Sequence, residues 1–198
     1  MNRPAGSPQA RLLRAVLLAL LAALLCAAAK PPDEYLDEET AATLTIVAEP
    51  LVFACDRRDL GAYARDYLTL AAVAVNRNRH VSYVLLAYFW STVAPHLRVD
   101  ALPAPELLVL QADDRQIELH RGAHTARDAG ISVLVHPPPG TAASPLVYPT
   151  DLATLRFLAE AHRLKVLSDS NATPTGFVLW DDERDALRAF VQHLGGGP

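Results

Sequence analysis

Two long apolar runs, separated by a short polar segment, dominate the middle of the chain. They cover residues 67–75 and 81–93, and residues 76–80 between them read Asn-Arg-Asn-Arg-His. The second run is rich in β-branched and aromatic residues and contains neither glycine nor proline, which favours a strand over a helix. Both of its faces are apolar, so it is predicted to be a central strand covered on each side. We therefore predict a β-hairpin whose polar loop supplies the positive-φ positions of the turn.

Further strands are predicted on both sides of this hairpin. The first covers residues 43–54, where Pro50 indicates an edge position or a bulge because proline cannot donate to a strand ladder. Residues 56–66 are expected to form one or two helical turns with Leu60, Tyr63 and Ala64 facing inward. Downstream, alternating polarity and turn residues predict a second hairpin, formed by 107–111 and 116–121, and a short strand at 131–136.

The hydrophobic period changes in the last third of the chain. Leucines recur at helical spacing from Thr150, a suitable N-cap, to about Ala161. A strand at 163–168, a turn at 169–174 and a strand at 175–180 follow. A final helix is expected after Asp181 or Asp182, with its apolar face formed by Ala186, Leu187, Phe190, Val191 and Leu194. This order predicts an α+β fold: an antiparallel β-sheet or sandwich-like meander with two C-terminal helices packed on one face.

The N-terminal 29 residues have the pattern of a secretory signal peptide. Arg3, Arg11 and Arg14 precede an apolar stretch that ends in three alanines before Lys30. Fifteen apolar residues are short for a membrane anchor, and Cys26 lacks the neighbours of a lipidation site, although both alternatives stay open. We therefore predict a signal peptide at 1–29, an acidic linker at 30–42 and a single α+β domain at 43–198, exported to the periplasm or the cell exterior.

Charge and cysteine content narrow the function classes. The chain carries a net charge of −4. Removal of residues 1–29 takes away three arginines and no acidic residue, which leaves −7. A moderately acidic chain without a basic stripe argues against nucleic acid as a partner. After residue 29 no apolar segment is long enough to span a membrane, and Cys55 is the only cysteine, so an intrachain disulfide is not expected.

Three histidines are the only candidates for a metal site. His120, His124 and His136 lie close together in sequence, with Glu118 nearby, and imidazole and carboxylate groups are typical zinc ligands. A glycine between His120 and His124 places the two histidines on a loop. The competing interpretation is therefore that they are exposed polar residues at a turn and bind no metal. Cys55 precedes two arginines that could lower its pKa, but it has no histidine nearby in sequence to act as a base.

No short motif of a hydrolase, kinase or nucleotide-binding protein is present. Aromatic residues of the central strand, such as Tyr88 and Trp90, could form the floor of a ligand groove, but residues at this spacing usually belong to a core. We therefore predict a non-catalytic envelope protein that binds a small ligand or an envelope protein, or acts as a scaffold, without a cofactor. The alternative is a secreted hydrolase that uses a metal held by His120, His124 and His136.

Overall fold

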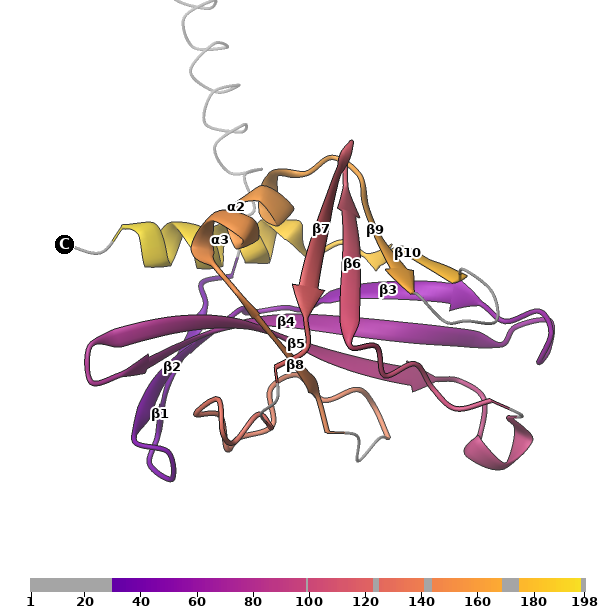
Figure 1. Ribbon diagram of the computed structural model, residues 1–198, viewed down its shortest axis with the longest axis horizontal. Coiled ribbons are helices and arrows are strands. Elements are labelled where there is room, and N and C mark those ends of the chain that lie inside the picture. The colour runs from indigo at the N-terminus through magenta and orange to yellow at the C-terminus, as the bar shows by residue number, and fades with distance from the viewer. Residues whose placement is uncertain (1–29, 99, 123–124, 141–143, 169–174, 197–198) are drawn as a thin grey trace, which may run out of the picture.

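The computed structural model describes residues 30–98, 100–122, 125–140, 144–168 and 175–196 (Figure 1). Within them, ten strands form one antiparallel sheet, accompanied by two α-helices and a 3₁₀ helix. In chain order the elements are β1 (Asp33–Asp37), β2 (Ala42–Ile46), β3 (Leu51–Asp56), β4 (Arg65–Arg77), β5 (His80–Ser91), η1 (Pro95–Leu97), β6 (Leu107–Ala112), β7 (Arg115–His120), β8 (Leu146–Thr150), α2 (Leu152–Glu160), β9 (Leu164–Ser168), β10 (Thr175–Asp181) and α3 (Arg184–Gly195). The predicted α+β fold is confirmed, whereas the predicted leader at 1–29 and turn at 169–174 lie outside the described residues.

The central hairpin is formed by β4 and β5, as predicted. The two strands pair along their whole length, from Asp66 opposite Ser91 to Arg77 opposite His80. The loop is tighter than the five residues expected, because Asn78 and Arg79 alone make the turn, with φ of 52° and 66°. Positive φ at both central residues matches the twist of the flanking strands.

The predicted first strand is two strands that run in line along the same edge of β4. In β2, Ile46 pairs with Val73, and in β3, Leu51 pairs with Leu70. Four residues, 47–50, therefore oppose two residues of β4, which is a bulge, and Pro50 lies within it. The prediction that Pro50 marks a bulge or an edge is thereby confirmed.

The sheet curves strongly beyond these central strands. On one side it continues from β3 through β10, β9 and β6 to β7, and on the other side β5 pairs with β8. The backbone N–H of Gly122, just after β7, donates to the carbonyl of Val147 in β8 at 2.8 Å, which brings the two ends of the sheet together. The sequence did not predict β8, a short strand that contains Pro149.

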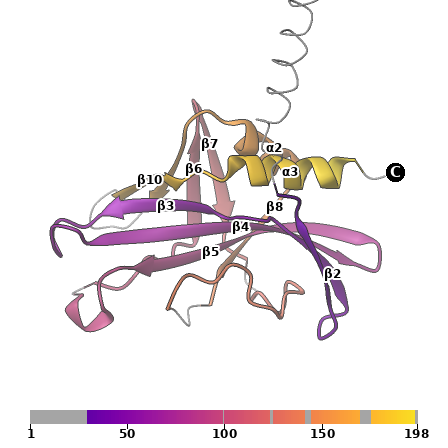
Figure 2. The same cartoon turned by 180° about the vertical axis from the view of Figure 1, so that it is seen from behind.

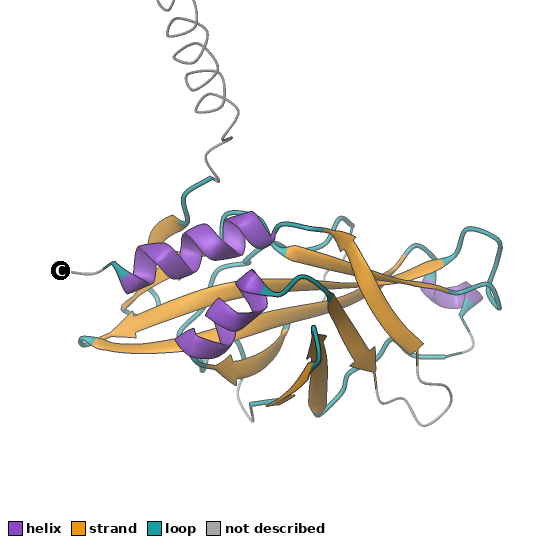
Figure 3. Cartoon of the chain, turned by 90° about the horizontal axis from the view of Figure 1, so that it is seen from above, coloured by secondary structure: helices purple, strands orange, loops and turns teal. Residues whose placement is uncertain are grey.

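The two faces of the central hairpin are covered by different parts of the chain (Figures 1 and 2). Helices α2 and α3 lie on one side, and Leu85 of β5 shares a small core gap there with Leu158 and Leu187. The segment between β7 and β8 lies on the other side, toward which Tyr88 points because successive strand residues alternate in direction. Figure 3 shows α3 lying along the hairpin, with α2 beside it.

Both helices bury the faces that the sequence predicts, but their first residues differ. α2 is capped by Asp151, whose carboxylate accepts the N–H of Thr154 at 2.6 Å, so Thr150 is not the cap. α3 follows Glu183, and Asp182 accepts the N–H of Arg184 at 3.3 Å. The buried side chains of α3 are Ala186, Leu187, Phe190 and Val191.

Three local predictions are wrong. Residues 33–37 of the expected acidic linker form β1, which pairs with β2 and leaves most of its acidic side chains exposed. Residues 57–64 form turns without a helix, and the side chain of Tyr63 points to solvent at 91% exposure instead of facing inward. Residues 131–136 do not form a strand, since their polar groups bond to other segments, as described below.

Candidate functional site

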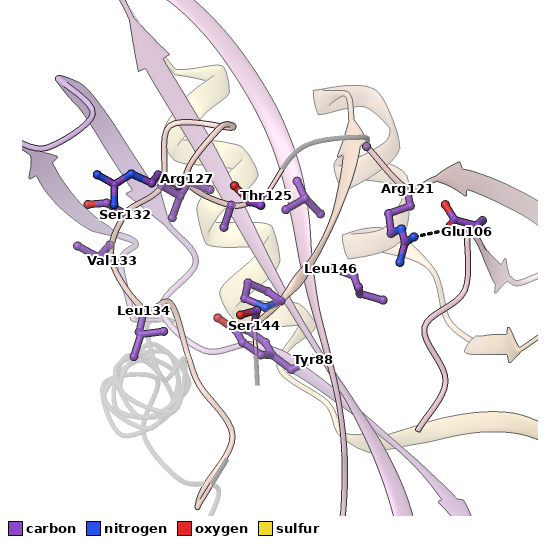
Figure 4. A pocket seen from close by; sticks show the side chains of 15 residues that line it. Tyr88, Glu106, Arg121, Thr125, Arg127, Ser132, Val133, Leu134, Ser144 and Leu146 are labelled. Atoms are coloured by element: carbon purple, nitrogen blue, oxygen red, sulfur yellow. Dashed lines mark hydrogen bonds and ion pairs between the residues drawn. The ribbon is translucent and has the colours of Figure 1, made fainter. Parts of the chain in front are cut away.

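A pocket lies between the central hairpin and the segment that joins β7 to β8. It has a volume of about 650 Å³, within the usual range for small-molecule sites of roughly 300–1,000 Å³. Figure 4 shows Arg121 and Arg127 on opposite sides of it, with Tyr88, Ser144 and Leu146 between them. The described residues that line it are Tyr88, Glu106, Arg121, Gly122, Thr125, Ala126, Arg127, Ile131, Ser132, Val133, Leu134, Ser144, Pro145, Leu146 and Val147.

A compact turn begins the pocket wall. The N–H and hydroxyl of Thr125 both donate to the carboxylate of Asp128, at 3.1 and 2.9 Å. The chain then folds back, and the N–H of Ile131 donates to the carbonyl of Ala126 at 2.9 Å. Gly130 has φ of +90°, and an added Cβ would lie 3.0 Å from Val75, so a larger residue would strain this turn. The turn places the buried side chain of Ile131 beneath the pocket.

The turn between β1 and β2 holds this wall in place. The carboxylate of Asp37, which is buried, accepts both the N–H and the hydroxyl of Ser132 at 2.7 Å. The hydroxyl of Thr40 donates to the carbonyl of Gly130 at 2.8 Å. Burial alone would raise the pKa of Asp37, but the hydrogen bonds from Ser132 and Thr40 outweigh it and hold the pKa below its usual value. A residue of the predicted linker is therefore part of the support of the pocket.

Tyr88 lies beneath the pocket with its hydroxyl buried. The side chain is 1% exposed, and within the described part of the chain the hydroxyl makes no hydrogen bond of normal geometry. The backbone of Val135 favours ionisation of this hydroxyl. Burial raises the pKa of Tyr88 and outweighs this effect, so the hydroxyl keeps its proton at neutral pH.

The two arginines of the pocket differ in exposure. The side chain of Arg121 is 30% exposed and forms an ion pair with Glu106 on the rim. The side chain of Arg127 is 68% exposed and forms an ion pair with Glu39, which does not line the pocket. Each of the two guanidinium groups is therefore balanced by the carboxylate of its partner.

Tyr148 of β8 fixes the rim near Arg121. Its hydroxyl donates to the carbonyl of Pro105 at 2.6 Å, next to Glu106. Burial raises the pKa of Tyr148 to about 12, so this hydroxyl also remains a donor over the ordinary pH range. The strand that the sequence did not predict thus positions one end of the pocket.

The two described histidines of the predicted metal set, His120 and His136, are not among the residues that line this pocket. His120 is exposed at the end of β7, and His136 is half-buried with its Nε2 atom 2.7 Å from the carbonyl oxygen of Val47. His124 lies outside the described residues. Among the residues that are described, no group of three or more His, Cys, Asp or Glu side chains is arranged to hold a metal ion.

The environment of Cys55 does not activate its thiol. The residue is buried, and burial raises its pKa, with the nearby carboxylate of Asp66 adding to the effect and Arg57 only partly opposing it. A thiol with a raised pKa is a poor nucleophile at neutral pH. Cys55 therefore serves as a small apolar residue of the core.

Asp66 is a second buried carboxylate, at the opposite end of β4 from the hairpin turn. Its Oδ2 atom lies 2.7 Å from Nη1 of Arg57, and its Oδ1 atom pairs with Arg98, just after η1. Burial would raise the pKa of Asp66, but hydrogen bonds from Arg98, Ser91 and Arg57 outweigh it and lower the pKa. The ion pairs of Asp66 with Arg57 and Arg98 connect the segment after η1 to the sheet, and each charged side chain in them has a neighbour of opposite charge.

Comparison with known proteins does not add a function. No family model, curated protein or solved structure matches the chain at a significant level. Among the helices of the described residues, none combines the length and the apolar composition of a membrane span. What can be defined is the class: a small α+β domain with a curved antiparallel sheet and a pocket beside its central hairpin.

Proposed function

We propose that this is an exported, non-catalytic protein of the cell envelope that binds a small ligand in the pocket beside Tyr88. The observation that supports it most is a cavity of ligand size, about 650 Å³, lined largely by apolar side chains together with a few polar ones. Small-molecule sites typically have this composition, in which the polar groups orient the ligand. The leader pattern at residues 1–29 supports export.

The polar groups of the pocket favour binding over catalysis. The hydroxyl of Ser132 donates to Asp37, but a carboxylate with a lowered pKa is a weak base and does not activate a hydroxyl. The alternative, a secreted hydrolase with a metal on His120, His124 and His136, gains no support from a contact of the described residues. Zinc analysis of the purified protein distinguishes the two: stoichiometric zinc, lost in a His120→Ala, His136→Ala double variant, would favour the hydrolase.

The export part of the proposal is tested by intact-mass measurement on protein from cells that express the full chain. We expect a mature chain that begins at Lys30, or within one residue of it. A diacylglyceryl mass on Cys26 would show a lipid anchor instead, and a chain of full length would contradict cleavage.

The binding part is tested with two fluorescent dyes, 8-anilinonaphthalene-1-sulfonate and its uncharged counterpart N-phenyl-1-naphthylamine. We expect at least one of them to bind with one-to-one stoichiometry. Leu134 lines the pocket and is 73% exposed, so Leu134→Ser should weaken binding without unfolding the protein. Leu97 is similarly exposed, at 65%, and does not line this pocket, which makes Leu97→Ser the matched control.

A further inference from the structure

We infer that the pocket selects a small organic anion with an apolar body, with Arg121 binding the anionic group. This inference rests on the proposed function, since it names the class of ligand for the same pocket. Three features of the described residues carry it: the difference between the two arginines, the rigid frame of the pocket and the apolar walls.

Arg121 is the better placed of the two arginines to bind an anion. Its side chain is 30% exposed, whereas its partner Glu106 is 74% exposed, so the existing ion pair lies mostly in solvent. Exposed ion pairs contribute little, so a ligand anion can join or replace Glu106 at low cost. The guanidinium group offers parallel N–H donors that match a carboxylate or sulfonate. Arg127, at 68% exposed, is screened by water and should contribute much less.

The frame of the pocket is rigid. Tyr88, beneath the cavity, belongs to the central hairpin, and Ser132 in the opposite wall is fixed by Asp37. The cavity is therefore formed before the ligand arrives, which favours affinity.

The walls between these groups are apolar. Ile131, Val133, Leu134 and Val147 line the cavity together with Pro145 and Leu146. A cavity of this kind binds a hydrocarbon or aromatic body through burial of apolar surface, while a few polar groups orient it. Arg121 pairs with Glu106, which is mostly exposed, so a ligand with one negative group can take the place of that carboxylate while its apolar body fills the cavity.

The two dyes test this inference directly, because they share their rings and differ by one sulfonate, which represents the anionic group of the ligand. Fluorescence titration should show the sulfonate dye binding at least tenfold more tightly than the neutral dye. Arg121→Gln should weaken the sulfonate dye roughly 10- to 100-fold, the effect of losing a charged hydrogen bond, and the neutral dye less than about twofold. Arg127→Gln, the matched control, should change either affinity less than about twofold.

The outcomes separate this inference from the proposed function. If the two dyes bound with equal affinity, and Leu134→Ser weakened the binding of both, the ligand would not need to be an anion. The proposal that the pocket binds a small ligand would still stand. If Arg121→Gln and Arg127→Gln reduced the affinity for the sulfonate dye equally, the role of Arg121 would be overturned. Binding of neither dye, or binding that Leu134→Ser does not change, would overturn the proposed function and the inference together. Thermal melts of each variant confirm that it is folded.

Discussion

Asp37 and Ser132, 95 positions apart in sequence, share two hydrogen bonds of 2.7 Å that join the end of β1 to the pocket wall. Both donors of Ser132, its N–H and its hydroxyl, point to the Asp37 carboxylate, which is 1% exposed. The N–H groups of Glu39 and Thr40 also donate to it, both at 3.2 Å. A carboxylate with four donors is stable while buried and needs no cation. It fixes two segments that have no strand pairing with each other.

Asp37→Asn should therefore destabilise the protein and loosen the pocket wall. The amide loses the charge that strengthens four hydrogen bonds and presents N–H groups to donors, so we expect a loss of about 2 kcal/mol in the free energy of unfolding, in the range for hydrogen bonds to a charged group. Urea melts measure it. Asp33→Asn, on the same strand but exposed, is the control and should change stability by less than about 0.5 kcal/mol. Equal effects of the two substitutions would contradict the anchoring role.

Stability should fall in acid because of the two buried carboxylates. The pKa values of Asp37 and Asp66 are both lowered from 3.8 in the folded protein. A group with a depressed folded-state pKa stabilises the fold above its unfolded-state pKa, and this contribution is lost as the pH falls through the folded-state pKa. Urea melts between pH 7 and pH 2.5 should show the decline beginning near pH 4. Asp37→Asn should make the decline shallower, whereas a decline of unchanged steepness in Asp37→Asn would show that Asp37 does not contribute.

The same substitution at two buried tyrosines should have different effects. Tyr148 donates to Pro105, whereas Tyr88 donates to no described residue, and both are nearly inaccessible to solvent. Tyr148→Phe leaves the carbonyl of Pro105 without its donor, so it should cost about 1–2 kcal/mol, whereas Tyr88→Phe removes an unsatisfied hydroxyl and should cost nothing or stabilise by up to about 1 kcal/mol. Denaturant melts of the two variants decide this. A loss in Tyr88→Phe as large as in Tyr148→Phe would show that the Tyr88 hydroxyl has a partner.

Much of the fold could be predicted because hydrophobic period is a local property of the sequence. The two runs that became β4 and β5 are too long and too apolar for any other role, and the spacing of Leu187, Phe190 and Val191 defines the inner face of α3. Pro50 marked the bulge between β2 and β3 by removing a donor. β8 was missed because it is short and contains Pro149, which argues against a strand unless it lies at an edge.

The pocket could not be predicted, because its wall has no repeating pattern and depends on a distant partner. Residues 131–134 are mostly apolar and partly β-branched, as in a strand, but Ser132 bonds to Asp37 at the end of β1 without any strand pairing. The sequence does suggest Tyr88 as a core residue, and its burial confirms that, but the lack of a hydrogen-bond partner for its hydroxyl among the described residues is a property of the packing alone. The turn that begins at Thr125 and ends at Gly130 is the one local signal that could have indicated an ordered loop.

The last prediction concerns α3, which we expect to be a packing element. The side chain of Phe190 is 0% exposed, so Phe190→Ala should cost about 3–5 kcal/mol through lost burial and an unfilled cavity. Arg188 is not a neutral surface residue, because it donates to the carbonyl of Ala159 at 3.2 Å and so connects α3 to α2. Gln192, exposed on the same helix, is the better control, and Gln192→Ala should change stability by less than about 0.5 kcal/mol. Denaturant melts measure all three variants, with Arg188→Ala expected between the other two. If Phe190→Ala kept full stability while dye binding in the pocket was lost, α3 would act on the ligand site and not as support for the core.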